Sequence, residues 1–132
     1  MREEMMKQLL MGLMLLMTAG AASAEWTQID DNDEYITYVD RATIRRNGNF
    51  VKMWSLKDFK TVRTVSGISY LSSMDQSEFD CKEEKTRILP FTWFDGKMGH
   101  GKVVYSDFDS SRWIPIQPGS VGETLWKVAC GK

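Results

Sequence analysis

The sequence predicts an α+β domain, in which a small antiparallel β-sheet of about six strands carries one C-terminal helix. Segments rich in β-branched and aromatic residues alternate with turn residues over positions 26–116. A helix-start signal comes last, after Pro118 and Gly119. Two cysteines, Cys81 and Cys130, lie in the predicted sheet region and in the predicted helix. Strands first and one helix last predict an antiparallel sheet with the helix packed on one face.

The first 24 residues have the composition of a secretory signal peptide. A short charged region ends at Lys7, an apolar run covers residues 9–17, and Ala22-Ser23-Ala24 forms a small-x-small cleavage site. The run is about half of the roughly 20 residues that span a bilayer as a helix, so we expect no transmembrane segment. No cysteine follows the run, so we expect no N-terminal lipid anchor. Cleavage near Ala24 would leave an exported domain of residues 25–132, either periplasmic or at the cell surface.

The charge balance excludes one class of partner. The net charge is −1 for the whole chain, and it stays at −1 without the first 24 residues. A nucleic-acid-binding domain would be clearly basic, so we expect no nucleic-acid partner. The remaining length suits one small domain with a single core.

Strands and turns alternate along the first half of this domain. Asp40 is expected to cap one helical turn over residues 41–44, and Asn47-Gly48 predicts a hairpin with a type I′ turn. We expect a mobile loop over residues 60–66, which show no periodicity. The strands predicted here are Trp26–Ile29, Tyr35–Val39, Phe50–Phe59 and Gly67–Met74.

The second half continues this pattern and ends with the helix. Pro90 should place its strand at an edge or at a bulge. The extended segments predicted here are Phe79–Cys81, Lys85–Phe94, Lys102–Phe108 and Trp113–Ile116. Ser120 and Glu123 have the spacing of a capping box, which predicts a helix over Val121–Cys130.

The two cysteines are most simply explained as a disulfide between Cys81 and Cys130, because exported chains enter an oxidising compartment. The alternatives are two free thiols or a pair of metal ligands. The apolar face of the predicted helix is too wide to leave in water, so we expect the helix to lie on the sheet.

The sequence contains residue types that can act in catalysis or bind metals, but they lack the neighbours that such chemistry needs. His100 is the only histidine and lies between two glycines, which suits an exposed turn. The adjacent carboxylates Glu83-Glu84 and Asp30-Asp31 point apart on a strand or turn. We therefore expect no catalytic residues, no metal and no cofactor. A hydrolase would need a deep pocket with convergent carboxylates.

Five tryptophans are many for a domain of this size. Large rings can fill a small core, and they can also form a stacking platform for sugars or peptides. Core filling is the favoured interpretation for most of them, and Trp93 is expected to be the most exposed.

Charge is segregated along the chain. Residues 25–40 hold six acids and no base, whereas residues 41–63 hold seven bases and one acid. Strands of opposite sign can pair across the sheet, or the bases can form a ridge for an acidic partner. Lys132 presents an ammonium beside a carboxylate, the group that lysine-binding kringle modules capture. The predicted partner contacts are Arg41, Arg45, Arg46, Lys60, Arg63 and Lys132.

Several motifs together resemble one family. They are Y-V-D at 38–40, K-M-W-S-L-K-D-F at 52–59, E-F-D-C at 78–81, K-M-G-H-G-K-V-V at 97–104 and W-I-P-I-Q-P-G-S-V-G-E-T-L-W-K-V-A-C at 113–130. This pattern is similar to the surface-adhesin protein E-like family of Gram-negative bacteria. The resemblance implies a small antiparallel sheet joined to a C-terminal helix by the disulfide.

The resemblance also implies a non-enzymatic surface protein that binds host matrix proteins such as vitronectin and laminin, or plasminogen. The first hypothesis is therefore an exported binding module for a host protein. The alternative is a soluble periplasmic factor for the stability or assembly of other envelope proteins. An exposed sheet edge would also allow a homodimer by strand pairing.

Overall fold

The structure, a computed structural model, describes residues 24–132. The predicted signal peptide therefore lies outside the described residues, apart from Ala24. In chain order the elements are β1 (Thr27–Asp31), β2 (Tyr35–Asn47), β3 (Phe50–Val65), β4 (Ile68–Asp80), β5 (Lys85–Phe94), the short 3₁₀ helix η1 (Lys97–Gly99), β6 (Val103–Asp107), β7 (Ile114–Pro115) and α2 (Val121–Cys130).

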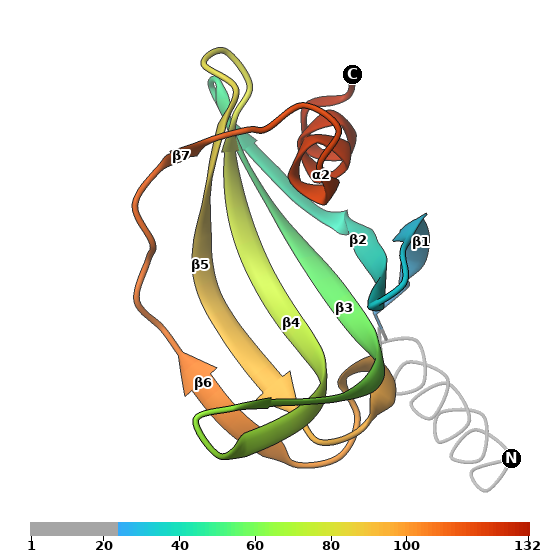
Figure 1. Ribbon diagram of the computed structural model, residues 1–132. Coiled ribbons are helices and arrows are strands. Elements are labelled where there is room, and N and C mark those ends of the chain that lie inside the picture. The colour runs from blue at the N-terminus through green and yellow to red at the C-terminus, as the bar shows by residue number, and fades with distance from the viewer. Residues whose placement is uncertain (1–23) are drawn as a thin grey trace, which may run out of the picture.

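Strands β1 to β6 form one antiparallel sheet in sequence order, and the short β7 pairs with β5. Figure 1 shows α2 against the upper part of one face, with the segment that contains β7 passing along β5. The β3–β4 hairpin turns across the lower end of the sheet (Figure 1). The predicted α+β fold, an antiparallel sheet of about six strands with one helix packed on it, is confirmed.

The mobile loop predicted over residues 60–66 is wrong, because β3 continues to Val65. Val65 pairs with Ile68, so the ladder with β4 runs to the tip of the hairpin. The register shifts between Asp58 and Arg63, and this bulge interrupts the alternation of side chains that would have indicated a strand. β4 likewise runs without a break to Asp80.

The hairpin predicted at Asn47-Gly48 is confirmed, but its turn type is not I′. The two loop residues are Gly48 and Asn49, and of these only Gly48, with φ 61°, has positive φ. Positive φ at the first central residue alone defines a type II′ turn, which favours Gly there. The type I′ pattern occurs at the next hairpin, where Ser66 and Gly67 have φ 50° and 81°.

The helical turn predicted after Asp40 is replaced by a bulge within β2. The register places residues 41–44 opposite Met53 alone. Thr43 Oγ1 accepts a hydrogen bond from the Trp54 amide at 3.0 Å and donates one to the Asp40 carbonyl at 2.6 Å. The Thr43 side chain thus links β2 to β3 by a hydrogen bond at the bulge. Pairing with β3 on both sides of the bulge keeps this part of β2 in the strand.

Another bulge lies in β5, where Pro90 was expected to disturb the ladder. Asp75 pairs with Phe91 and Ser77 pairs with Ile88, so β5 has one extra residue between them. Proline lacks the amide hydrogen that a regular ladder needs at this point. The predicted bulge at Pro90 is confirmed.

Helix α2 begins and ends where the sequence predicts. Ser120 Oγ accepts a hydrogen bond from the Glu123 amide at 3.1 Å, as in a capping box. The reciprocal bond differs, because Glu123 Oε1 accepts from the Gly119 amide at 3.5 Å rather than from Ser120. The cap satisfies amide groups that have no partner within the helix.

The core lies between α2 and the upper half of the sheet. Val39, Val51, Met53 and Phe79 are at most 1% exposed and pack against Leu125, Trp126 and Ala129 of α2. The Cys81–Cys130 disulfide joins the end of β4 to the end of α2, as predicted. The Trp126 indole also donates to the Asp80 carbonyl at 3.0 Å. The helix is therefore fixed to β4 by a covalent bond and a hydrogen bond.

Candidate functional site

We call the face of the sheet that packs against α2 the helix face. α2 covers only its upper half, and the lower half is hollowed. Two adjoining hollows of about 330 and 230 Å³ lie there and share Lys57, Asp75 and Ile88. The larger hollow reaches the first turn of α2 at Val121, and the smaller one lies among aromatic side chains. We call the two hollows together the aromatic groove.

Six aromatic side chains form a continuous cluster across this half of the sheet, from β2 to β6. The ring centroids are 5.5 Å apart for Tyr35 and Phe59, 5.4 Å for Phe59 and Tyr70, 4.1 Å for Tyr70 and Trp93, 5.0 Å for Trp93 and Tyr105, and 5.8 and 5.9 Å from Phe91 to Trp93 and Tyr105. Phe59 and Tyr70 are buried, whereas Tyr105 is 38% exposed and the other three are half-buried. The buried pair therefore supports rings that still face solvent.

The strand register explains why these rings meet. Lys57 pairs with Ser73, and Ser73 pairs with Trp93, so all three side chains lie on the helix face. The bulge in β3 bends the hairpin end of the sheet back over this face, as bulges do. Tyr70 thereby stacks on Trp93 and meets Phe59 edge-on.

A charged pair of residues lies at the centre of the groove. Asp75 is 9% exposed, and its carboxylate accepts a hydrogen bond from Ser73 Oγ at 2.6 Å. Lys57 is half-buried, with Nζ 5.2 Å from the centroid of the Tyr35 ring. The salt bridges found in residues 24–132 include neither Lys57 nor Asp75. Both groups therefore have unused hydrogen-bonding capacity.

The surroundings of Asp75 change its acidity. Burial raises the pKa of the Asp75 carboxyl above its ordinary value, because desolvation disfavours the charged form. The hydrogen bond from Ser73 and the nearby Lys57 charge lower this pKa, but by less. The ionised carboxyl is thus poorly solvated, and an added hydrogen-bond donor would stabilise it.

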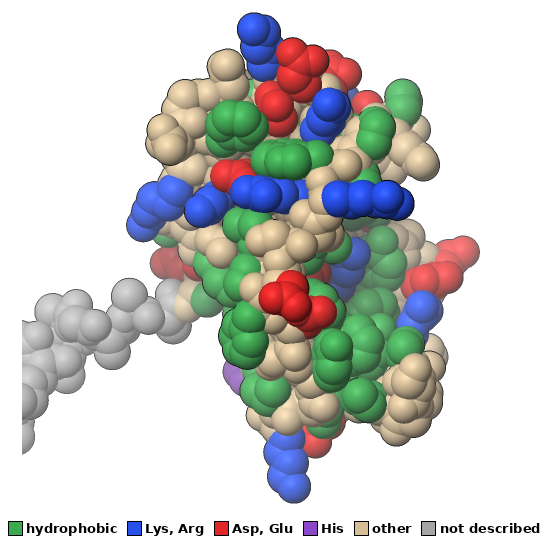
Figure 2. Space-filling view, turned by 90° about the vertical axis from the view of Figure 1, so that its left-hand side faces the viewer, with side chains coloured by type: hydrophobic (Ala, Val, Ile, Leu, Met, Phe, Trp, Pro, Cys, Tyr) green, Lys and Arg blue, Asp and Glu red, His purple; other side chains and the backbone are tan. Residues whose placement is uncertain are grey.

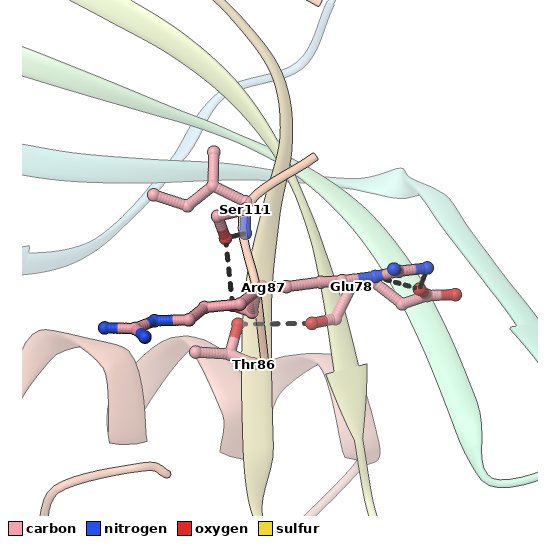
Figure 3. Close-up of polar contacts among 6 residues, drawn as sticks. Glu78, Thr86, Arg87 and Ser111 are labelled. Carbon is pink, nitrogen blue, oxygen red and sulfur yellow. Dashed lines mark hydrogen bonds and ion pairs between the residues drawn. The ribbon is translucent and has the colours of Figure 1, made fainter. Parts of the chain in front are cut away.

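The segment before α2 frames the upper end of the groove and is fastened to β5. The Ile88 amide donates to Ser111 Oγ at 2.9 Å, and the Ser111 amide donates to the Ile88 carbonyl at 2.8 Å. Figure 3 shows Ser111 beside β5, with Thr86 below it and Arg87 extended toward Glu78. Two Arg87 nitrogens contact Glu78 Oε1 at 2.8 and 2.6 Å. The two Ser111 bonds thus attach the segment to β5, whereas the Arg87–Glu78 pair joins β5 to β4.

The six predicted contact residues lie in separate parts of the molecule. Lys60 and Arg63 lie near the far end of β3, where they form salt bridges with Asp31 at 2.7 Å and Glu34 at 3.2 Å. Arg63 also lies over the Phe59 ring at 5.4 Å. For these two bases, the structure shows pairing between acidic and basic segments rather than a continuous ridge.

The other four lie toward the α2 end of the sheet. Arg41, Arg45 and Arg46 are exposed on the second half of β2. Arg45 and Arg46 line a hollow of about 190 Å³ together with Lys52. Lys132 is exposed, and its Nζ lies 5.7 Å from the centroid of the Trp126 ring. Figure 2 shows a row of Lys and Arg side chains across the side of the molecule formed by β5 to β7, with hydrophobic side chains gathered below it.

The sequence did not single out the residues of the aromatic groove as a site. Trp93 was expected to be the most exposed aromatic, but it is half-buried, and Phe108 is 75% exposed. Trp126 fills the core, as expected of most tryptophans, whereas Trp26, Trp54 and Trp113 are half-buried. Alternation along each strand could have assigned Tyr35 and Tyr105 to a face of their own strand. Whether these faces form one surface depends on the order of the strands in the sheet.

The described residues contain no cluster of three or more His, Cys, Asp or Glu side chains placed to hold a metal ion. His100 is an exposed residue that follows η1, as expected from its two flanking glycines. Within residues 24–132, no helix has the length and apolar character required to cross a membrane.

Comparison with solved structures identifies the fold. A structure of Haemophilus influenzae protein E in crystal form II superimposes with a TM-score of 0.60 at 13% identity, covering 83% of this chain and 97% of that one. Another structure of Haemophilus influenzae protein E gives a TM-score of 0.58 at 11% identity, with 83% and 91% covered. The comparison with curated proteins finds no match.

Sequence comparison gives the same assignment. Residues 26–131 match the family described as surface-adhesin protein E, which is nearly the whole described chain. The resemblance drawn from the sequence motifs is thus confirmed, and the chain belongs to the surface-adhesin protein E family.

Proposed function

We propose that this chain is an exported, non-enzymatic binding module that holds a partner against the lower half of its helix face. The aromatic groove carries this proposal, because partly exposed rings surround a buried carboxyl and a lysine with unused hydrogen-bonding capacity. Grooves that bind ligands are mostly apolar and contain a few convergent polar groups. Membership of an adhesin family supports binding rather than catalysis.

The partner class that best fits the family is a host protein, such as a matrix protein or plasminogen. The bases around the groove and at the α2 end would add electrostatic attraction for acidic partners. Of the six predicted contacts, four form no salt bridge within residues 24–132, so their charges remain available to a partner: Arg41, Arg45, Arg46 and Lys132. Lys60 and Arg63, which already pair with acids, are proposed as weaker contacts.

Binding to immobilised vitronectin, laminin and plasminogen tests this proposal. The combined charge reversal of Arg45 and Arg46 to Glu should reduce the association rate, whereas that of Lys60, already paired with Asp31, should reduce it less. Trp93→Ala should lower affinity by increasing the dissociation rate. No binding to any host protein above a matched globular control would contradict the proposed partner class.

The alternative is a soluble periplasmic factor that uses the same face on other envelope proteins. Protease accessibility on intact cells separates the two. Cleavage from outside supports display at the surface, whereas protection until the outer membrane is opened supports the periplasmic alternative.

Sedimentation of the purified domain tests the proposed homodimer, since the outer edges of β1 and β6 have no partner strand in residues 24–132.

A further inference from the structure

The chemistry of the aromatic groove narrows the ligand beyond a protein partner in general. Asp75 would repel a carboxylate or phosphate in the groove, and Lys57 would repel a cation. A purely apolar ligand would remove water from both groups and give neither a hydrogen bond, which is costly. A ligand that fits both is neutral and offers several hydrogen-bond donors and acceptors.

The aromatic side chains add a second requirement. Phe91 and Trp93 line the smaller hollow with half-buried rings, and the exposed Tyr105 ring packs beside both of them. The faces of such rings carry negative partial charge, which attracts the weakly positive C–H groups of a saturated ring. The hollow of about 230 Å³ is smaller than the roughly 300–1,000 Å³ pockets of drug-sized ligands, so it suits one small ring.

The position of the groove argues against an extended peptide as the ligand. A peptide strand binds at a sheet edge, where backbone amide and carbonyl groups are free to pair. The groove instead lies on the face of the sheet, where β3, β4 and β5 already use their backbone groups in the ladder. A peptide there would leave most of its own amides without partners.

We propose that the aromatic groove binds a neutral pyranose unit of a glycan, packed against the rings of Phe91 and Trp93 and hydrogen-bonded to Asp75, Ser73 and Lys57. Adjacent hydroxyls on one edge of a sugar both donate and accept, which matches a carboxylate beside an ammonium. This inference rests on the proposed function, because it takes the groove as the binding face and names what the partner presents there.

The test is an NMR titration of the ¹⁵N-labelled domain with neutral methyl glycosides of glucose, galactose, mannose, N-acetylglucosamine and N-acetylgalactosamine. At least one should produce saturable shifts in the Trp93 indole and in the amides of Ser73 and Asp75. The anionic methyl glycoside of N-acetylneuraminic acid should produce none. No saturable shift in the groove with any neutral glycoside, or equal shifts with the anionic one, would overturn the proposal.

Variants locate the site. Phe91→Ala and Asp75→Asn should each weaken binding of the active glycoside by about tenfold or more, since the first removes a ring that lines the hollow and the second removes a charged hydrogen-bond acceptor. Trp113→Ala is the matched control, because Trp113 packs on Phe50 and Arg87, away from the groove. Far-UV circular dichroism confirms that each variant is folded. Equal binding by Phe91→Ala, Asp75→Asn and Trp113→Ala would overturn the site.

The two proposals fail in distinguishable ways. If the domain binds a host protein equally well before and after the glycans of that host protein are removed enzymatically, and binds no free glycoside, the inference is wrong and the proposed function stands. If it binds a glycoside but no host protein, the inference stands and the proposed partner class is wrong.

Discussion

The two halves of the helix face are built from the same strands but have different roles. Under α2, the sheet presents the aliphatic and aromatic side chains Val39, Val51, Met53 and Phe79, all at most 1% exposed. Beyond α2, the same strands present Lys57, Asp75 and a set of aromatic rings that remain partly exposed. The covered half therefore excludes water almost completely, whereas water reaches the open half.

This difference indicates where stability and function lie. Burial of apolar area contributes about 25 cal/mol per Å², so the covered half supplies most of the hydrophobic stabilisation. The open half keeps rings half-exposed and an acid in a poorly solvated position, which a fold selected only for stability would avoid. Substitutions in the two halves should therefore separate these effects.

The largest contrast is expected between two phenylalanines. Phe79→Ala should lower the free energy of unfolding by about 3–5 kcal/mol, because it leaves a cavity beneath α2. Phe91→Ala in the open half should cost only about 1–2 kcal/mol, because that ring is already partly solvated. Urea denaturation of both variants measures the difference. Equal losses would show that the open half belongs to the same sealed core.

The disulfide tests how the covered half is held. Cys130→Ser should lower stability by about 2–5 kcal/mol, because it frees the end of α2 from the end of β4. The matched control is the wild type with and without reductant, which should reproduce most of the loss. Binding at the open half should weaken far less than stability. An unchanged melting temperature under reducing conditions would count against a stabilising role for this bond.

The cap of α2 gives a smaller effect at the boundary between the halves. Ser120→Ala should cost about 1 kcal/mol, because the Glu123 amide loses its side-chain acceptor and keeps only the Ser120 carbonyl. Ser110→Ala is a suitable control, since Ser110 is exposed in the preceding loop. Thermal unfolding of the two variants measures the difference. A loss no larger than that of the control would show that the bond from Gly119 to Glu123 suffices as a cap.

The fold was predictable to the extent that its signals are local. The Ser120 cap and the limits of α2, the strand Lys85–Phe94 and the bulge at Pro90 all follow from residues close in sequence. The secondary-structure prediction was wrong where pairing between strands overrides a local preference. Residues 60–66 have no alternation of their own, and they are extended because β4 pairs with them.

The groove was less predictable for the same reason. Lys57 and Asp75 are 18 positions apart, and they become neighbours only through the register of β3 and β4. The run of bases in residues 41–63 is evident from the sequence, but the sequence does not show that Lys60 and Arg63 pair with acids from another segment. Charge counts along a chain do not show which charges remain unpaired on the surface.

Asp75→Asn gives the smallest expected effect and tests the open half most directly. Because the folded-state pKa of this carboxyl is raised, the folded protein binds its proton more tightly than the unfolded chain does. Wild-type stability should therefore fall as pH rises from the ordinary carboxyl range, about pH 4, through the raised pKa. The variant cannot ionise, so it should be more stable than the wild type at neutral pH and equal to it at lower pH.

Melting temperatures of the wild type and Asp75→Asn between about pH 3 and pH 8 measure this difference. Asp33→Asn is the control, because Asp33 is exposed in the turn after β1. If Asp75→Asn is less stable at neutral pH, the attraction of Lys57 outweighs desolvation, and the Asp75 charge belongs to the structure of the open half. If it is more stable but binds less tightly, the open half retains a charge that costs stability, which is expected of a binding site.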